Sequence, residues 1–203
     1  MRVVVLSAGK STRLDGICKM LVWAKDKPVH KWHTDAWLEV PLDAVVLSKD
    51  VKTLASNEWN GSEIYGYDGG GGPASALRHY LSKTTHTGTL LVSFADSLLK
   101  GPVMDRGDWV GVSNMPINRQ WDYPAAKGWI RGKPRVPVCM GLYQFTDVDA
   151  LRHAIDKISP ERFSPEIPMV DVLTQYHKIH PLRDLYIGGW QDAGDWESIK
   201  TVR

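Results

Sequence analysis

The sequence predicts an α/β fold with a largely parallel sheet. Short apolar runs rich in β-branched residues alternate along the first half of the chain with stretches whose apolar residues have helical spacing. The apolar runs lack polar alternation, which is typical of strands buried on both faces. Strands that alternate with helices form βαβ units, so their order along the chain predicts a parallel arrangement.

The individual elements follow from these two patterns. In the first half we expect strands at residues 3–6, 44–47, 64–67 and 89–94, and helices at 29–38 and 74–81. In the second half we expect strands at 109–112 and 136–145 and helices at 148–158 and 169–176, separated by irregular segments rich in Pro and Gly. Ligands of such folds bind beyond the carboxyl ends of the strands.

Size and composition limit the classes of protein. The 203 residues suit one domain, and 25 Lys+Arg against 23 Asp+Glu leave a net charge of +2, which demands neither a nucleic-acid nor a membrane partner. No apolar run approaches the ~20 residues of a membrane-spanning helix, and the apolar start is too short for a signal peptide. Cys18 and Cys139 fit no metal or redox spacing, so we expect a reducing cytoplasm. The nine tryptophans are unusual, and stacking on a ligand stays open beside ordinary packing.

The loop after the first strand carries the strongest chemical signal. Residues 7–14 form a loop that contains Gly9 and several Ser and Thr residues, and such a loop can present backbone N–H groups to phosphate as the chain enters a helix. Lys10 and Arg13 add positive charge to this loop. An NTPase P-loop is excluded because Val4 stands where the first glycine of that motif is needed. A plain βα turn with surface charges is the alternative.

A family resemblance begins in this loop. The segment Leu6-Ser7-Ala8-Gly9-Lys10-Ser11-Thr12-Arg13-Leu14, followed by Gly16-Ile17-Cys18-Lys19, resembles the signature loop of nucleotidyltransferases that make nucleotide-diphosphate sugars. Cys18 replaces the usual proline before the lysine, and Ser11 stands where many sugar-1-phosphate enzymes have glycine. The serine form is commoner in the molybdopterin-cofactor branch, so the loop alone does not select a branch.

Further segments resemble the family in the same order. They are Lys27-Pro28-Val29, Gly71-Gly72-Pro73-Ala74-Ser75-Ala76-Leu77, Leu91-Val92-Ser93-Phe94-Ala95-Asp96, Cys139-Met140-Gly141-Leu142-Tyr143-Gln144-Phe145 and Gly189-Trp190-Gln191-Asp192-Ala193-Gly194-Asp195-Trp196-Glu197. The last two favour sugar-phosphate enzymes. Two departures are Asp26 in place of a glycine, and Gly132-Lys133-Pro134 where many members have a glutamate.

The resemblance implies a three-layer α/β/α sandwich with a mixed, mainly parallel sheet, the Rossmann-like nucleotide-diphospho-sugar transferase (GT-A-like) fold. It implies one domain over residues 1–203, with a nucleotide-binding half at 1–100 and a sugar-phosphate half at 101–203. The implied catalytic residues are Arg13 and Lys19, the nucleotide-binding residues Ser7, Ala8, Gly9, Lys10, Ser11, Thr12, Gly71, Gly72 and Pro73, and the sugar-phosphate residues Lys127, Gly141 and Trp190.

Asp96 and Asp192 are the candidate metal ligands. Asp96 follows a strongly apolar strand, and Mg²⁺ prefers one or two carboxylates together with substrate phosphates. The alternative makes Asp96 a turn former and Asp192 a surface residue. Asp195 competes for this role but fits the first turn of a helix better. His30 and His33, three residues apart on an expected helix, have no evident third metal ligand.

The sequence therefore predicts a Mg²⁺-dependent nucleotidyltransferase that joins an NTP and a sugar 1-phosphate. Its expected partners are these small molecules, with no nucleic acid and no membrane, and association into a homo-oligomer stays open. A cytidylyltransferase acting on a cofactor, an alditol phosphate or phosphocholine is one alternative, and a non-catalytic nucleotide-binding relative is another. Glycosyl transfer is disfavoured because Asp96-Ser97-Leu98 lacks the second aspartate of the usual D-x-D triplet.

Overall fold

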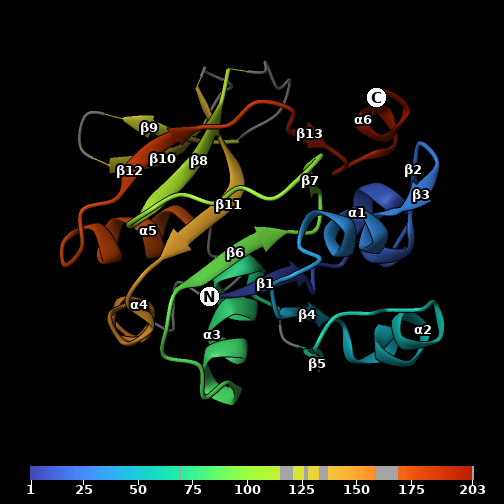
Figure 1. Ribbon diagram of the computed structural model, residues 1–203, viewed down its shortest axis with the longest axis horizontal. Helices are drawn as coiled ribbons and strands as arrows, with labels where there is room; N and C mark the ends of the chain where they lie inside the picture. Colours follow the sequence, from blue (N-terminus) through green and yellow to red (C-terminus); the bar gives the residue numbers. More distant parts are fainter. Residues whose placement is uncertain (69, 115–120, 126–127, 133–136, 159–168, 203) are drawn as a thin grey trace.

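A computed structural model describes residues 1–68, 70–114, 121–125, 128–132, 137–158 and 169–202, with the backbone alone for 121–125 and 128–132. Its centre is a seven-stranded sheet in the order β12-β8-β11-β6-β1-β4-β5 (Figure 1). The strands are β1 (Arg2–Ser7), β4 (Leu42–Val46), β5 (Glu63–Gly66), β6 (Leu90–Phe94), β8 (Trp109–Ser113), β11 (Val138–Phe145) and β12 (Arg183–Tyr186). The pairings are parallel except for those of β11 with β6 and β8. The mixed, mainly parallel sheet is therefore confirmed.

Alternation along β1 divides the core into two layers. Val3 and Val5 belong to one buried cluster, whereas Val4 and Leu6 belong to the other, as the period of two in a strand requires. The first cluster packs against α1 (Val29–Ala36), α2 (Val51–Ser56) and α6 (Trp196–Lys200), and the second against α3 (Gly72–Lys83), α4 (Val148–Asp156) and α5 (Met169–His177). The result is the expected three-layer α/β/α sandwich (Figure 1).

The order of the strands places a topological switch point between β1 and β6. The chain leaves β1 and builds β4 and β5 on one side of it, then returns through α3 to place β6 on the other side. Connections that depart in opposite directions from two adjacent strands leave a crevice at their carboxyl ends. That crevice lies beyond Ser7 of β1 and Phe94 of β6.

The loop after β1 differs from its prediction. We expected it to enter a helix, but the chain forms two short 3₁₀ turns, η1 (Thr12–Leu14) and η2 (Lys19–Leu21). Ser11, Asp15 and Gly16 have positive φ angles, in the left-handed region of the backbone. A right-handed α-helix cannot continue through such residues, so η1 stays a single short turn.

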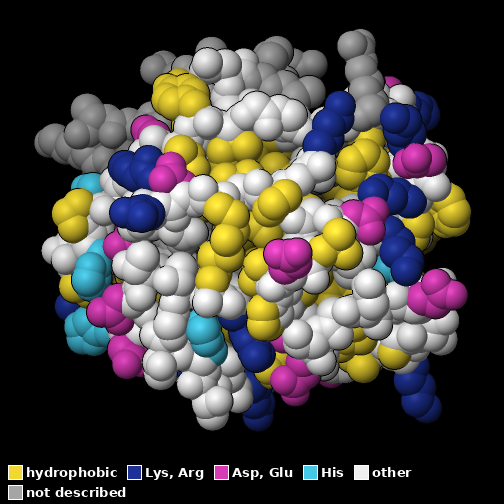
Figure 2. Space-filling model, in the orientation of Figure 1, with side chains coloured by type: hydrophobic (Ala, Val, Ile, Leu, Met, Phe, Trp, Pro, Cys, Tyr) yellow, Lys and Arg dark blue, Asp and Glu magenta, His cyan; other side chains and the backbone are white. Residues whose placement is uncertain are grey.

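Short elements complete the fold. They are η3 (Ser48–Asp50) and three antiparallel strand pairs, namely β2 (Trp23–Ala24) with β3 (Lys27–Pro28), β7 (Ser97–Leu98) with β13 (Gln191–Asp192), and β9 (Trp121–Ala125) with β10 (Gly128–Gly132). On the face drawn in Figure 2, Lys and Arg side chains lie beside Asp and Glu side chains. Among the described residues, no helix has the length and apolar content needed to cross a bilayer.

Gly141 allows an irregularity in the central strand β11. Its φ of +71° lies in the left-handed region, and the register of β11 against β8 shifts between Cys139 and Tyr143. A Cβ atom on Gly141 would lie 2.7 Å from Cδ2 of Phe94 and 2.8 Å from Oγ of Ser97. Both the backbone angle and the space therefore require glycine at this position.

We expect Gly141→Ala to lower the free energy of unfolding by about 2 kcal/mol, because a non-glycine residue at positive φ is strained and the added methyl group displaces Phe94. Urea denaturation measures the change. Gly188→Ala is the matched control, because no atom lies within 4 Å of its added Cβ and its φ is not positive. Equal stability of the two variants would contradict the requirement at Gly141.

Candidate active site

A cleft of about 260 Å³ opens at the switch point between β1 and β6. Its walls come from six segments: the end of β1 with the following loop, η2, the start of α3, the end of β6, the bulged part of β11, and the C-terminal segment before α6. The lining residues are Leu6, Ala8, Gly9, Lys10, Ser11, Thr12, Arg13, Lys19, Gly72, Pro73, Ala76, Phe94, Asp96, Cys139, Gly141, Tyr143 and Gly194.

The loop after β1 lines the cleft with residues 9–13, whose backbone N–H groups are called the N–H cradle below. The Ser11 carbonyl oxygen accepts hydrogen bonds from the N–H groups of Leu14 and Gly16, at 2.8 and 3.0 Å, while Ser11 itself has a φ of +50°. The backbone N–H groups of residues 9–13 donate none of the hydrogen bonds found among the described residues. Such N–H groups, with Lys10 and Arg13 on the same loop, are suited to bind an anion.

Cys18 does not disturb the turn that carries Lys19. Cys18 has a φ of −55°, which a proline also adopts, so the replacement of the usual proline preserves the backbone course. Burial raises the pKa of the Cys18 thiol to about 11, so the thiol stays protonated at neutral pH. The next residue, Lys19, is part of the cleft wall.

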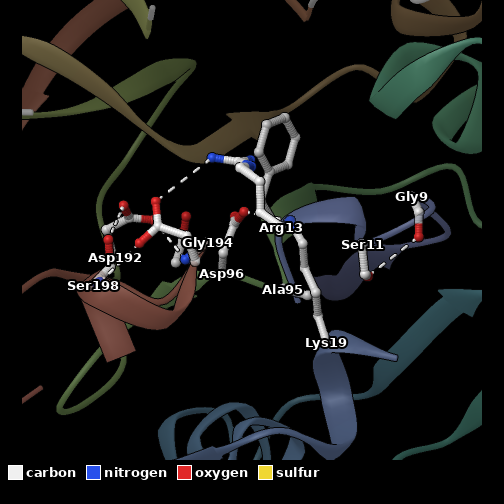
Figure 3. A network of polar contacts seen from close by, with 12 residues as sticks. Gly9, Ser11, Arg13, Lys19, Ala95, Asp96, Asp192, Gly194 and Ser198 are labelled. Carbon is white, nitrogen blue, oxygen red and sulfur yellow. Dashed lines mark hydrogen bonds and ion pairs between the residues drawn. The ribbon is translucent and has the colours of Figure 1, made fainter. Parts of the chain in front are cut away.

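Lys19 and Asp96 form an ion pair across the cleft. The Nζ atom of Lys19 lies 2.6 Å from Oδ2 of Asp96, and both side chains are largely buried, with 19% and 8% of their surfaces exposed. Figure 3 shows Lys19 reaching Asp96 from the side opposite to Asp192. A charge-assisted hydrogen bond of this length, shielded from water, is among the stronger polar contacts in a protein.

The backbone around Asp96 is held from three directions. The N–H of Ala95 donates to the carbonyl of Leu6 at 3.1 Å, and the carbonyl of Asp96 accepts from the N–H of Ala193 at 2.8 Å. On α1, Nε2 of His33 lies 3.1 Å from the carbonyl oxygen of Ala95. Burial lowers the pKa of His33 to about 4, so its ring is neutral at physiological pH.

Asp192 lies next to Asp96 because β13 pairs with β7. Asp192 is opposite Ser97 in this pair, so two carboxylates that are far apart in sequence come from neighbouring backbone segments (Figure 3). The side chain of Asp192 accepts hydrogen bonds from the N–H of Gly194 at 3.0 Å and from Oγ of Ser198 at 3.2 Å. These contacts fix its orientation.

The segment before α6 contributes Gly194 to the cleft wall. Asp195 caps the helix through a hydrogen bond from the N–H of Ser198 at 2.8 Å, so it lies directly before the first turn in which we expected it. Its other oxygen, Oδ2, lies 4.0 Å from NH1 of Arg13. Nε1 of Trp196 donates to Asp15 at 3.0 Å, so the start of α6 and its N-cap residue both contact the first loop.

Two carboxylates fit a divalent cation that also binds phosphate. Among the described residues, no group of three or more His, Cys, Asp and Glu side chains could hold a metal ion. Asp96 and Asp192 offer hard oxygen ligands, and Mg²⁺ usually takes one or two such carboxylates, with water and substrate phosphates completing its coordination. The donor set therefore suits Mg²⁺ delivered with a nucleotide rather than an ion held by protein ligands alone.

The N-terminus of α3 and the apolar face of β11 form the remaining walls. Gly71 has a φ of +108° and precedes the first turn of α3, which places Gly72 and Pro73 at the cleft. The N-terminus of a helix carries a partial positive charge that favours an anion. On the other wall, the rings of Phe94 and Tyr143 meet edge to face, with centroids 5.6 Å apart.

Most of the predicted site residues meet in this cleft. Those that line it are Ala8, Gly9, Lys10, Ser11, Thr12, Arg13, Lys19, Gly72, Pro73, Asp96 and Gly141. Ser7 and Gly71 lie buried directly beside lining residues, and Asp192 lies behind Gly194. Trp190 is only 4% exposed and belongs to the hydrophobic core instead of the cleft wall. Lys127 lies outside the described residues.

Seven residues near the site were missed or misread from the sequence. Six of them line the cleft but were not among the predicted site residues, namely Leu6, Ala76, Phe94, Cys139, Tyr143 and Gly194. His33 was considered only as a metal ligand together with His30, whereas its ring bonds to the backbone before Asp96. A polar residue on the buried face of a helix needs a hydrogen-bond partner, which was the one available signal for His33.

The comparisons with known proteins agree with this geometry. The family model of the MobA-like NTP transferase domain matches residues 3–105, just over half of the chain. No curated protein matches the sequence significantly.

Solved structures resemble the whole chain. One is a Bacillus anthracis protein assigned as a glucose-1-phosphate thymidylyltransferase, solved in complex with sucrose. It has a TM-score of 0.77 at 17% sequence identity, and the match covers 100% of this chain and 93% of the Bacillus anthracis chain. The nucleoside-diphosphate-sugar pyrophosphorylase of Vibrio cholerae RC9 has a TM-score of 0.73 at 14% identity, covering 97% of this chain and 98% of its own. The inositol-1-phosphate CTP transferase of T. maritima has the same TM-score and identity, with coverages of 97% and 90%.

At such identities the structures establish the shared fold, and the family follows from the matched domain together with the ordered motifs. The chain therefore belongs to the MobA-like NTP transferase domain family, whose activity is nucleotidyl transfer.

Proposed function

We propose that the protein joins an NTP and a sugar 1-phosphate, with Mg²⁺, to give a nucleotide-diphosphate sugar and pyrophosphate. The observation that carries the proposal is the juxtaposition of an N–H cradle, three cations and a carboxylate in one cleft at the switch point. A triphosphate needs several donors and positive charges, and a metal-bound phosphate needs a nearby carboxylate. The Vibrio cholerae pyrophosphorylase, which shares the fold, supports the sugar phosphate as acceptor.

The first loop binds the triphosphate in this proposal. The N–H groups of residues 9–13 donate hydrogen bonds to the phosphate oxygens, and Ser7, Ala8 and Thr12 complete the loop's fit to the nucleotide. Lys10 and Arg13 neutralise the β- and γ-phosphates. Gly71, Gly72 and Pro73 bring the N-terminus of α3 close to the nucleotide, where a side chain in place of a glycine would obstruct a close approach.

The reaction itself needs alignment and charge stabilisation rather than a base. An oxygen of the sugar 1-phosphate forms a bond to the α-phosphorus as the bond to the β-phosphate oxygen breaks, and pyrophosphate leaves with that electron pair. The nucleophile is already an anion, so no proton is removed. Lys19 stabilises the charge on the reacting phosphorus, and Arg13 stabilises the leaving pyrophosphate.

Asp96 and Asp192 would hold Mg²⁺. When bound, this ion would neutralise phosphate charge and orient the reacting groups. The ammonium group of Lys19 is bonded to Oδ2 of Asp96, so this oxygen is engaged by the ion pair. Release of that oxygen on nucleotide binding leaves Lys19 free to contact the α-phosphate.

We propose a division of labour within one domain. Residues 1–100 supply the loop, Lys19, the start of α3 and Asp96 for the nucleotide. Residues 101–203 supply Gly141 and Asp192 for the acceptor. Lys127, which lies outside the described residues, stays a prediction for the same role. A single sheet contains strands of both halves, so the two groups of residues are held on one rigid scaffold.

The transfer of a nucleotidyl group to another phosphate is the second candidate. Ser11 matches the molybdopterin-cofactor branch, the family model is MobA-like, and the T. maritima enzyme of the same fold uses inositol 1-phosphate and CTP. The cleft residues that handle the triphosphate are the same in this alternative. The acceptor therefore separates the two, and substrate testing must include both classes.

We expect pyrophosphate release that requires one NTP and one acceptor together, because attack on the α-phosphorus needs both in the cleft. The assay combines ATP, GTP, CTP, UTP or dTTP with Mg²⁺ and a panel of sugar 1-phosphates, inositol 1-phosphate, an alditol phosphate, phosphocholine and molybdopterin. Release with a sugar 1-phosphate supports the proposal, and release only with another acceptor selects the alternative. Thermal stabilisation by an NTP without release from any pair would favour a non-catalytic relative.

We expect Asp96→Asn and Lys19→Ala each to lower kcat/KM by at least 100-fold, since loss of one charge-stabilising contact typically costs about 3 kcal/mol in the transition state. Asp26→Asn and Lys52→Ala are matched controls, because both residues are exposed and lie outside the cleft wall. Steady-state kinetics and thermal melting are measured for all four variants. Turnover within a few-fold of the wild type, in a folded Asp96 or Lys19 variant, would contradict the role of that residue.

A further inference from the structure

We propose that His33 is a positioning residue for catalysis, which fixes the peptide bond before Asp96 so that the Asp96 side chain faces the cleft. The inference rests on the proposed function, because it assigns His33 a purpose in that same site. Its basis is the contact of the His33 ring with the Ala95 carbonyl, together with the burial of both residues.

The direction of this hydrogen bond follows from its acceptor. A carbonyl oxygen can only accept, so Nε2 of His33 must carry the proton and donate across the 3.1 Å separation. His33 is 2% exposed and Ala95 is 1% exposed, so water cannot replace the donor without a rearrangement. A buried carbonyl that loses its donor would be destabilised, which favours a different backbone course at Ala95.

Helix α1 is placed to fix both partners of the Lys19–Asp96 ion pair. It packs against η2, which carries Lys19, and against β7, which follows Asp96. Nε1 of Trp32 also donates to the Ala24 carbonyl at 3.1 Å, which ties α1 to the β2–β3 hairpin. His33 therefore extends from a helix that also contacts η2, which carries Lys19.

His33 bonds to the only carbonyl between the end of β6 and Asp96. The N–H of Ala95 is bonded to β1 and the carbonyl of Asp96 to the C-terminal segment, so these two bonds fix the chain on either side of the Ala95–Asp96 peptide. The bond from His33 fixes that peptide itself. The peptide plane sets the direction in which the Asp96 Cα–Cβ bond points, and therefore the position of its carboxylate relative to Lys19.

His30 offers a matched control on the same helix. It is 1% exposed, lies one turn from His33, and its Nδ1 atom has no hydrogen-bond partner in the part of the chain that the structure describes. Substitution of His30 by phenylalanine therefore removes a buried imidazole from α1 without removing a bond to the turn that carries Asp96. His33→Gln is the conservative variant, because a glutamine amide can donate from about the position of Nε2.

The experiment compares His33→Phe, His33→Gln and His30→Phe in the full chain. Amide hydrogen exchange at Ala95, Asp96 and Ala193 reports the positioning of the turn directly and needs no substrate. We expect His33→Phe to speed exchange at these amides at least 10-fold, and His33→Gln to restore most of the protection. We expect His30→Phe to leave it within 3-fold of the wild type. Equal exchange in His33→Phe and His30→Phe would overturn the positioning role.

Kinetics with the substrate pair found for the wild type then test the link to catalysis. We expect His33→Phe to lower kcat at least 10-fold with KM for the NTP within 3-fold, because the phosphate cradle is untouched, and His33→Gln to recover most of kcat. An unchanged kcat despite faster exchange, or an equal loss in His30→Phe, would overturn the link to catalysis. If the wild type releases no pyrophosphate with any substrate pair, the proposed function fails and with it the catalytic part of this inference, whereas the exchange data still decide the positioning of Asp96.

Discussion

The site depends on the turn between β6 and β7, which carries Asp96. Four segments meet there: β1 through Leu6, α1 through His33, the C-terminal segment through Ala193, and η2 through Lys19. Each contact comes from a part of the chain that the turn reaches only in the folded state. The turn therefore links the sheet, the layer of helices that contains α1, and the C-terminal segment at one point, so its geometry depends on the packing of all three.

The cleft combines two kinds of surface because of where it lies. Parallel strands end in loops with free backbone N–H groups, and the helix after the switch point begins with its positive end toward the same crevice. The antiparallel strand β11 contributes an apolar wall instead, and its bulge at Gly141 brings Phe94 and Ser97 close to the strand. One wall is therefore suited to phosphate, and the other is suited to a less polar part of a substrate.

Most strands of the central sheet, the larger helices and the position of the first loop could be predicted from the sequence because their signals are local, whereas the two 3₁₀ turns of that loop could not. Runs such as Val3 to Leu6 are buried on both faces and need no alternation to be identified. The edge strand β12 is mostly exposed and polar, and β7 and β13 have two residues each, so neither pattern nor length marked them. The meeting of Asp96 with Asp192 depends on that short β7–β13 pair, and the bond from His33 depends on the packing of α1. Local patterns cannot predict such long-range contacts.

Cys18 shows the reverse situation. The sequence marks it as a departure from the family pattern, because it replaces a proline, but its φ of −55° shows that the backbone keeps the course that a proline would also adopt.

The most direct test of the account is a crystal structure of the protein with Mg²⁺ and a non-hydrolysable analogue of the NTP selected by the activity assay. The account predicts that the triphosphate lies along residues 9–13, with Mg²⁺ on Asp96 and with Nζ of Lys19 moved from Asp96 toward the α-phosphate. A nucleotide bound away from this loop, or a triphosphate in the cleft that leaves the Lys19–Asp96 pair closed and Asp96 without metal, would contradict it.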